Sequence, residues 1–490
     1  MSSDRRAPVI ALELALAALA LWRIWRFFAE LPIAAPFQHD YEEGNILNAL
    51  LRITQGLTPY PDPHALPNIL NPYGPVAYYL LVIPVKLFGV AFVYPRAMIL
   101  GCTIVVAVLI GVALRRGTGS ITLGVTFALI FLIIPNVHDW MWTLRVDLCG
   151  IAFTIAGLVV VSHGLNQRPH RLPMVLAGVL FALGILVKPT LLAAPAASFF
   201  ALVVRRKFAP AARLTAVTAA VVSAVLGAFA LLTHGAVIVD VFLSHPDPFS
   251  FPVYTQGLTE MLQMSWPLVI LATIAVARDL ARRRFSPAIL WLLFATLTAI
   301  TAGKLGSNKN HFLEWNAALC LAAGFGFDEL TRLASRRLAI AASAIAVAAA
   351  ALVIWHQPGN LTNIGPESDC PQAYEWVRTQ AGPNLFAENV GALVLGGKNV
   401  WVSNPFVLAQ LVEHAGWSDA ELVRMVRERR FDAISMRLDY PAIPSAVATG
   451  AERFSPALLR AIAASYEQHP GFNCRDMQIL YKPKPAIQSK

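Results

Sequence analysis

The chain has 490 residues, of which 57% are hydrophobic and only 14% are charged, and its net charge is +10. Soluble domains are typically about 25% charged, so this composition excludes an ordinary soluble protein. The lysines and arginines gather at the ends of apolar runs, and membrane topology explains them better than nucleic-acid binding does. We therefore expect contact with membrane lipids and none with nucleic acid.

Apolar runs close to or above the roughly 18 residues that cross a bilayer recur along residues 1–355. In chain order they cover residues 7–29, 76–92, 95–114, 120–135, 147–165, 173–187, 189–204, 211–232, 260–277, 286–303, 311–329 and 338–355. The basic clusters between them are Arg5/Arg6, Arg115/Arg116, Arg168/Arg171, Arg205 to Lys207, Arg278 with Arg282 to Arg284, and Arg332/Arg336/Arg337. If every cluster faces the cytoplasm, the runs make about eleven crossings, with residues 76–92 on the outer face. The sequence thus predicts an α-helical polytopic membrane domain with a cytoplasmic N-terminus.

Residues 356–490 differ in character, because charged residues become frequent and the apolar runs shorten. Strand-like runs at 384–390, 391–397, 399–403, 431–438 and 477–483 alternate with amphipathic helical stretches at 370–380 and 418–430. This pattern predicts a soluble α/β domain, which the crossing count places outside the cytoplasm. Cys370 and Cys474 are its two cysteines, and both a disulfide between them and two unpaired thiols fit the sequence.

The first outward loop, residues 30–75, carries the densest acidic cluster among the connections of the membrane domain. Asp40, Glu42 and Glu43 follow His39 soon after the first apolar run, at the predicted boundary between water and membrane. A carboxylate at that boundary can take the proton of a hydroxyl that attacks a lipid-bound donor. The alternative is that the acids form a solvated loop face or the N-terminal charges of the helix predicted to follow them.

Other polar residues at outward-facing ends of the runs are candidates for a substrate site: Asp139, Arg145, Lys188, Lys304, Lys309, His311 and Glu314. The positive-inside rule disfavours cations there, which suits the basic ones to a bound phosphate. Each candidate also has a structural alternative. Asp139 fits a helix cap, Arg145 an ion pair with Asp147, Lys188 snorkelling to the interface, and His311 with Glu314 a hydrogen-bond network between spans.

A metal site is a further alternative for this loop region. Asp40 and Asp139, together with nearby histidines, are suitable ligands for a divalent cation such as Mg²⁺ or Mn²⁺. No tight two-histidine spacing supports such a site. A Walker-type phosphate loop is also missing from the sequence, which favours a donor delivered through the membrane.

The membrane domain contains several sequence motifs in a defined order. The loop acids are followed by NPYGPVAYYLL, then by LRVDLCGIAF, by LGILVKPTLLAAP and by GKLGSNKNHFLEWNAALCLAAG. In this order they resemble the class C glycosyltransferases that use polyprenyl-phosphate sugars, such as the protein O-mannosyltransferases of glycosyltransferase family 39 and the aminoarabinose transferases of lipid A. The resemblance covers residues up to about 330, and the tail resembles the soluble domain of uncharacterised bacterial members.

The resemblance implies an inverting enzyme that moves a hexosyl or pentosyl unit from a polyprenyl-phosphate-linked sugar to a hydroxyl of a cell-envelope acceptor, on the outer face of a bacterial inner membrane. It matches Asp40 to the base, supported by Glu42 or Glu43, although the intervening Tyr41 leaves open which acid acts. It matches Asp139 to a second acid. A lipid or sugar transporter is the main alternative, but the polar residues lie at the outer edge rather than the midplane. An inactive assembly or sensor protein is another alternative.

Overall fold

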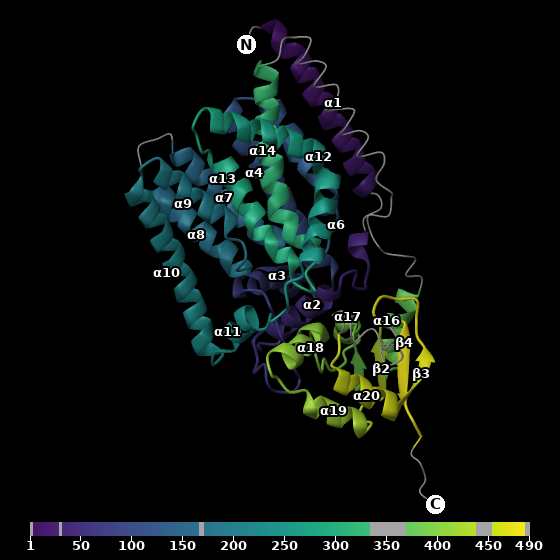
Figure 1. Ribbon diagram of the computed structural model, residues 1–490. Coiled ribbons are helices and arrows are strands. Elements are labelled where there is room, and N and C mark those ends of the chain that lie inside the picture. The colour runs from purple at the N-terminus through teal and green to yellow at the C-terminus, as the bar shows by residue number, and fades with distance from the viewer. Residues whose placement is uncertain (1–2, 29–31, 166–170, 334–368, 438–452, 486–490) are drawn as a thin grey trace, which may run out of the picture.

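The computed structural model describes residues 3–28, 32–165, 171–333, 369–437 and 453–485. They form two parts, a helical bundle built from the residues up to 333 and a smaller C-terminal domain (Figure 1). The C-terminal domain lies at one end of the bundle, and α1 begins at the opposite end. The predicted boundary near residue 356 and the predicted last span at 338–355 lie outside the described residues.

Helices occupy the predicted spans within the described part of the chain. They are α1 (Ser3–Phe28), α4 (Val93–Thr118), α5 (Ile121–Ile133), α7 (Asp147–Gly164), α8 (Arg171–Val187), α9 (Ala193–Val204), α10 (Phe208–Leu232), α12 (Phe251–Ala281), α13 (Pro287–Thr298) and α14 (Leu313–Leu333). Of the described helices, four are long and apolar enough to cross a membrane, namely α4, α7, α10 and α12. A helix satisfies its own backbone hydrogen bonds, which is what an apolar surrounding demands of each span.

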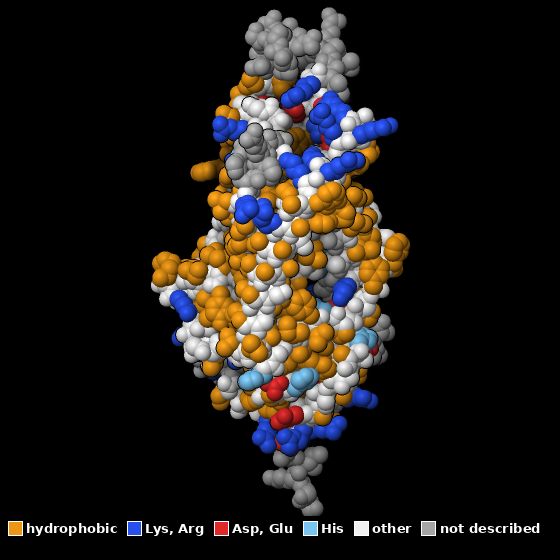
Figure 2. Space-filling view, turned by 90° about the vertical axis from the view of Figure 1, so that its left-hand side faces the viewer, with side chains coloured by type: hydrophobic (Ala, Val, Ile, Leu, Met, Phe, Trp, Pro, Cys, Tyr) orange, Lys and Arg blue, Asp and Glu red, His pale blue; other side chains and the backbone are white. Residues whose placement is uncertain are grey.

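Basic residues mark the end of the bundle that lies away from the C-terminal domain. Arg115 and Arg116 are in the last turn of α4, Arg278 is in the last turn of α12, and Arg332 is in the last turn of α14. Figure 2 shows many Lys and Arg side chains gathered toward this end, next to a broad apolar zone. These clusters share one end of the bundle, as the sequence predicted.

Short helices fill the other end, between the long helices and the C-terminal domain. They are η1 (Pro32–Ala34), α2 (Tyr41–Thr54), α3 (Pro75–Phe88), α6 (Pro135–Trp140), α11 (Ala236–Ile238), the π-helical turn η2 (Val239–Leu243), and the 3₁₀ turns η3 (Ala299–Gly303) and η4 (Lys309–Phe312). The α3 helix, which covers most of the predicted surface run 76–92, packs against α2, α4 and α8. This end therefore collects the connections in which the sequence analysis found its candidate residues.

The C-terminal domain contains a four-stranded sheet with the order β1-β2-β4-β3. Its strands are β1 (Leu385–Ala387), β2 (Ala433–Met436), β3 (Tyr466–Pro470) and β4 (Ile479–Pro483), and its helices are α16 (Cys370–Thr379), α17 (Val390–Leu395), α18 (Pro405–His414), α19 (Ala420–Arg427) and α20 (Pro456–Ser465). The β1 and β2 strands are parallel, with Leu385 opposite Ala433, and the other pairs are antiparallel. A disulfide joins Cys370 to Cys474 and so selects one of the two alternatives for these cysteines.

Two of the predicted strands are wrong. Residues 391–397 were expected to be extended, but α17 covers most of this run, because Asn389 caps a helix there by accepting from the Ala392 N–H at 2.9 Å. Residues 399–403 join no strand of the sheet, and Val402 instead forms an isolated bridge with Asn68 of the bundle. The β3 strand lies in a stretch for which no strand was predicted.

The two parts of the structure are joined through the first loop and α2. The backbone N–H of Asn68 donates to the Trp401 carbonyl at 2.8 Å, and the Ser403 N–H donates to the Asn68 carbonyl at 2.9 Å. Gly44 of α2 faces the start of α17 so closely that a Cβ atom on it would lie 2.3 Å from the nitrogen of Gly391. The backbone of the C-terminal domain therefore packs directly against the backbone of α2.

Gly44→Ala is expected to loosen this contact, because the added methyl group meets the backbone of Gly391, which cannot move aside as a side-chain end can. Overpacking of this kind costs roughly 1–3 kcal/mol. Limited proteolysis of the purified protein should release the C-terminal domain faster than in the wild type, with a lower thermal midpoint. Gly101→Ala in α4 is the matched control, because nothing lies within 4 Å of its added Cβ. Equal behaviour of the two variants would contradict a tight contact at Gly44.

Candidate functional site

The loop acids begin α2 as a capping box. Asp40 is the N-cap, and its side chain accepts from the Glu42 N–H at 3.1 Å. Glu43 reaches back to accept from the N–H groups of His39 at 2.6 Å and Asp40 at 3.4 Å. Acids at a helix N-terminus also interact favourably with its dipole. The predicted helix-terminal role is thus real for these acids, and their other partners decide what else each can do.

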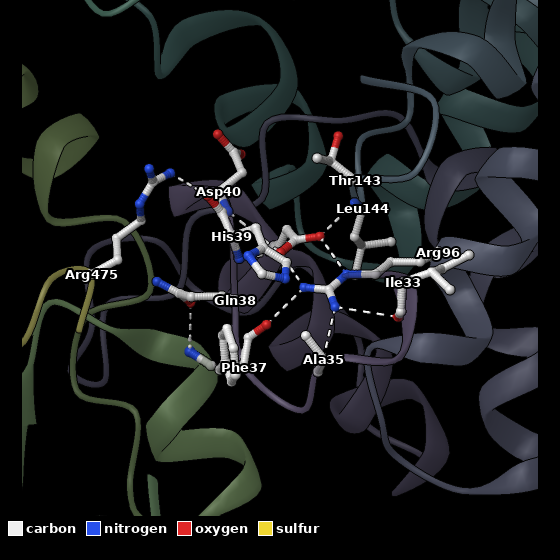
Figure 3. Close-up of polar contacts among 12 residues, drawn as sticks. Ile33, Ala35, Phe37, Gln38, His39, Asp40, Arg96, Thr143, Leu144 and Arg475 are labelled. Carbon is white, nitrogen blue, oxygen red and sulfur yellow. Dashed lines mark hydrogen bonds and ion pairs between the residues drawn. The ribbon is translucent and has the colours of Figure 1, made fainter. Parts of the chain in front are cut away.

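Glu43 is held in a buried ion pair with Arg96 of α4. The Arg96 Nε donates to Glu43 Oε1 at 2.8 Å and its Nη2 to Oε2 at 2.6 Å, and both side chains are completely buried. The same guanidinium donates to the carbonyls of Ala35 and Phe37, each at 2.8 Å, as Figure 3 shows. Burial favours the neutral acid, but Arg96 outweighs it and lowers the pKa of Glu43 to about 2. Glu43 therefore fixes the position of α2 and has little capacity to take a proton.

Asp40 forms its ion pair with Arg145. The Arg145 Nε lies 2.6 Å from Asp40 Oδ1, and its Nη1 donates to the Tyr73 hydroxyl at 3.0 Å. The guanidinium also lies over the ring of Trp140, 5.3 Å from the ring centroid. The predicted alternative, an Arg145 pair with Asp147, is wrong, because Arg145 turns to Asp40 instead.

Glu42 is bound by amides. It accepts from the Asn404 Nδ2 at 2.8 Å and from the Asn45 Nδ2 at 3.3 Å. Burial raises the pKa of Glu42, and the positive charge of Arg145 opposes this only in part. Burial thus makes the Glu42 carboxylate easier to protonate than an ordinary glutamate.

Asp147 and Lys188 form a second buried pair. Their ion-pair atoms lie 2.6 Å apart, and the Asn310 Nδ2 donates to both carboxylate oxygens at 3.1 and 3.2 Å. Together with His311 and Glu314 they line a small hollow. Lys188 is buried at this pair, so the snorkelling alternative is wrong for it.

The predicted network alternative holds for Glu314, which accepts from Trp291 Nε1 at 2.9 Å and from the Ala194 N–H at 3.3 Å. His311 shares a 2.9 Å hydrogen bond with the Thr301 hydroxyl. Both residues still reach the hollow described above. They therefore join neighbouring helices and line the candidate site as well.

Lys304 lies close to a half-buried histidine that the sequence analysis did not select. Its Nζ donates to the His245 carbonyl at 3.2 Å. Burial, together with Lys304 and Lys188, lowers the pKa of His245 to about 4, and burial with Lys188 lowers that of His311 to about 3. Both imidazoles are therefore neutral at pH 7, close to the positive charge of Lys188.

Asp139 and Lys309 lie apart from the Asp40 pair. Asp139 is in the last turn of α6, 3.8 Å from His138 Nδ1, so the capping alternative is wrong. Burial raises the pKa of Asp139 to about 7, although nearby Lys309 opposes the shift. Lys309 is paired with Glu260 at 2.6 Å, and both side chains are partly exposed.

The residues do not support the predicted metal alternative. Asp40 is engaged by Arg145, and Asp139 lies beside His138. Among the residues that the structure describes, no group of three or more His, Cys, Asp or Glu side chains is arranged to hold a metal ion.

Arg96, Tyr73 and Asn404 were missed by sequence reasoning. Arg96 had a signal, because it is a lone arginine near the start of an apolar run. Tyr73 and Asn404 had none, since tyrosine and asparagine are common in loops and their partners lie far away along the chain.

Neither the family models nor the curated proteins compared with this chain include a match. Solved structures do match it. ArnT from Cupriavidus metallidurans in the apo state is 12% identical, with a TM-score of 0.65 over 96% of this chain and 97% of ArnT. ArnT bound to undecaprenyl phosphate is 11% identical, with a TM-score of 0.63 over 96% and 98% of the two chains. The Archaeoglobus fulgidus oligosaccharyltransferase tethered to an acceptor peptide is 12% identical, with a TM-score of 0.52 over 96% and 74%.

These likenesses show the fold. The chain has the fold of the class C glycosyltransferases, which confirms the fold predicted from the sequence resemblance. Its apolar helices and this fold make it a multi-pass membrane protein.

Arg96→Met is expected to destabilise the protein strongly, because it leaves the buried Glu43 carboxylate without its cation. Breaking a buried ion pair in this way costs about 3–5 kcal/mol. Denaturant titration in detergent micelles measures the free energy of unfolding. Arg378→Met is the control, because Arg378 pairs with Glu375 in a solvent-exposed ion pair and should leave unfolding unchanged.

The same pair predicts a pH dependence. The pKa of Glu43 is lower in the folded protein than in the unfolded chain. Its ionisation therefore contributes fully to the free energy of unfolding at pH values above the unfolded pKa. It is lost as the pH falls below that value toward 2. In Arg96→Met the trend should reverse, because an unpaired buried carboxyl favours protonation. Parallel pH profiles for the wild type and Arg96→Met would argue against this account.

Proposed function

We propose that the chain is an inverting glycosyltransferase that moves a hexosyl or pentosyl unit from a polyprenyl-phosphate donor to an acceptor hydroxyl of the cell envelope. The observation that carries the proposal is the meeting of the loop acids with Arg145 beside the Asp147 to Lys188 pair, on the ArnT fold. ArnT itself was crystallised with undecaprenyl phosphate. A lipid-linked sugar is the donor class that fits both observations.

Glu42 is the acid best suited to act as the base. Arg96 lowers the pKa of Glu43 and so makes it a weak proton acceptor, and Asp40 is occupied by its ion pair with Arg145. Glu42 has only amide partners among its described hydrogen bonds, and burial raises its pKa. A general base works best with a pKa near the operating pH. We therefore favour Glu42 over Asp40 as the proton acceptor, with Asp40 holding Arg145 in position.

The leaving group requires positive charge. The acceptor oxygen forms a bond to the anomeric carbon, and the bond from that carbon to the phosphate oxygen breaks with its electron pair going to the phosphate. Arg145 and Lys188 lie at the site but already share their charge with carboxylates. Lys304 donates to the His245 carbonyl and, although Asp247 lies nearby, it forms no ion pair among the described residues, so its charge is better able to stabilise a phosphate.

The site is proposed to face the outside of a bacterial inner membrane. The basic helix ends lie at the opposite end of the bundle, and such ends are enriched on the cytoplasmic side. A disulfide in the C-terminal domain also suits an oxidising compartment. A polyprenyl donor carried to that face would meet Glu42 at the boundary between membrane and water.

Glu42→Gln is expected to lower sugar transfer by roughly 10²–10⁴-fold, the range for loss of a general base. Transfer of radiolabelled sugar from a panel of polyprenyl-phosphate donors to cell-envelope acceptors measures it, in membranes that contain the full chain. Asp40→Asn should lower sugar transfer less than Glu42→Gln does, and it should weaken the binding of the donor. Full activity in Glu42→Gln with loss in Asp40→Asn would move the base to Asp40. No transfer by the wild type across the panel would count against the enzyme and favour a transporter.

Lys304→Met is expected to weaken the binding of undecaprenyl phosphate about tenfold or more, because it removes a cation from the proposed phosphate site. The change in intrinsic tryptophan fluorescence of the purified protein on titration with this lipid reports binding. Lys86→Met in α3 is the control, because Lys86 is a solvent-exposed lysine outside the site. Equal affinities of the two variants would remove Lys304 from the phosphate site.

A further inference from the structure

The C-terminal domain touches the proposed base directly. Asn404 is completely buried and is the N-cap of α18, and its Nδ2 donates to Glu42 Oε1 at 2.8 Å. This distance is shorter than the 3.3 Å that separates Glu42 from the amide of Asn45 within α2. The shortest described side-chain hydrogen bond to Glu42 thus comes from a residue 362 positions away along the chain.

The orientation of the Asn404 amide is fixed by its other partners. Its Oδ1 accepts from the Val407 N–H at 3.2 Å, as an N-cap does, and from the Tyr41 hydroxyl at 3.3 Å. A backbone N–H can only donate, so the atom that faces it must be the oxygen. The NH₂ group of Asn404 is therefore the part that faces Glu42, and the donor role is not interchangeable.

Tyr41 is held in place by the same domain. The Phe406 N–H donates to its hydroxyl at 3.2 Å, and the Arg453 guanidinium lies over its ring, 4.2 Å from the centroid. Arg453 is in turn bound by the buried carboxylates of Glu388 and Asp476, the latter at 2.8 Å. This chain of contacts sets the position of the amide that holds Glu42.

We propose that Asn404 is a positioning residue of the reaction, with which the C-terminal domain holds the Glu42 carboxylate in its productive orientation and completes the catalytic site. The proposal rests on the proposed role of Glu42. Asn404 binds Glu42 Oε1, whereas Oε2 has only the longer 3.3 Å contact with the Asn45 amide and keeps a lone pair for the acceptor hydroxyl. The domain would then act on the chemical step itself, beyond any part in recognising the acceptor.

Asn404→Asp tests this with almost no change of shape. The aspartate keeps an oxygen to cap α18 and to accept from Tyr41, but it turns a second oxygen, in place of the NH₂ group, toward Glu42. Two facing carboxyl groups raise the pH at which one of them ionises. We expect kcat for sugar transfer to fall about tenfold or more with KM little changed. The acidic limb of the pH profile of kcat should move up by about one pH unit.

Asn389→Asp is the matched control. Asn389 is the N-cap of α17, its Oδ1 accepts from the Tyr374 hydroxyl, and its Nδ2 donates to the Arg475 carbonyl at 2.9 Å rather than to Glu42. This substitution changes the same kind of cap in the same domain. It should leave the acidic limb of the pH profile where it is in the wild type.

A second readout does not depend on activity. A hydrophobic carbodiimide reacts with protonated carboxyl groups, and peptide mass spectrometry of the full-length protein reports labelling of Glu42 at each pH. In Asn404→Asp the labelling should extend about one pH unit higher than in the wild type and in Asn389→Asp. Identical labelling curves in the three proteins would overturn the proposal. A shifted curve in a protein without any transfer activity would support the Asn404 contact and reject the proposed function.

If the thermal midpoint shows that Asn404→Asp does not fold, Tyr41→Phe tests the positioning role of Asn404 instead. It removes the hydroxyl that orients the Asn404 amide and should lower kcat, whereas Tyr374→Phe removes the equivalent hydroxyl from Asn389. A loss of kcat in Tyr41→Phe alone supports the proposal. Equal kcat in the two variants would reject it.

Discussion

The buried pair of Glu43 and Arg96 is the interaction on which the rest of the site depends. It joins the first turn of α2 to the first turn of α4, and the same guanidinium gathers the carbonyls of Ala35 and Phe37. Glu43 also closes the capping box around Asp40. Because a buried charge without its partner is so costly, the ion pair fixes the position of the N-terminus of α2. In this position Asp40 contacts Arg145, and Glu42 contacts the C-terminal domain.

Charge pairing then divides the work among similar residues. Two of the loop acids form ion pairs with arginines, whereas Glu42 is held by amides and is the proposed base. Among the cations, Lys188 is committed to Asp147, and Lys304 donates to a neutral carbonyl. In an environment of low dielectric such differences of partner become differences of function, as the opposite pKa shifts of Glu42 and Glu43 illustrate.

The C-terminal domain belongs to this arrangement through backbone and side-chain contacts. Gly44 and Gly391 let α2 and α17 approach closely, and the segment of Ser403 pairs with the first loop at Asn68. Figure 3 shows Arg475 of this domain beside His39, at the start of the same acidic stretch. The function proposed here therefore belongs to both parts of the chain, and the base lies where they meet.

The sequence by itself determined the elements that depend on local pattern. Apolar runs determined the helices, basic clusters determined one end of the bundle, and the acids after the first span marked the candidate site. Only the tertiary structure decided the pairings, including Arg145 with Asp40, Lys188 with Asp147 and Asn404 with Glu42. It also made residues 390–395 a helix, although their apolar pattern indicated a strand. The physical reason is that hydrophobic periodicity depends only on neighbouring residues in the sequence. The partner of a buried charge or amide instead comes from a distant segment, which only the packing of the chain brings near.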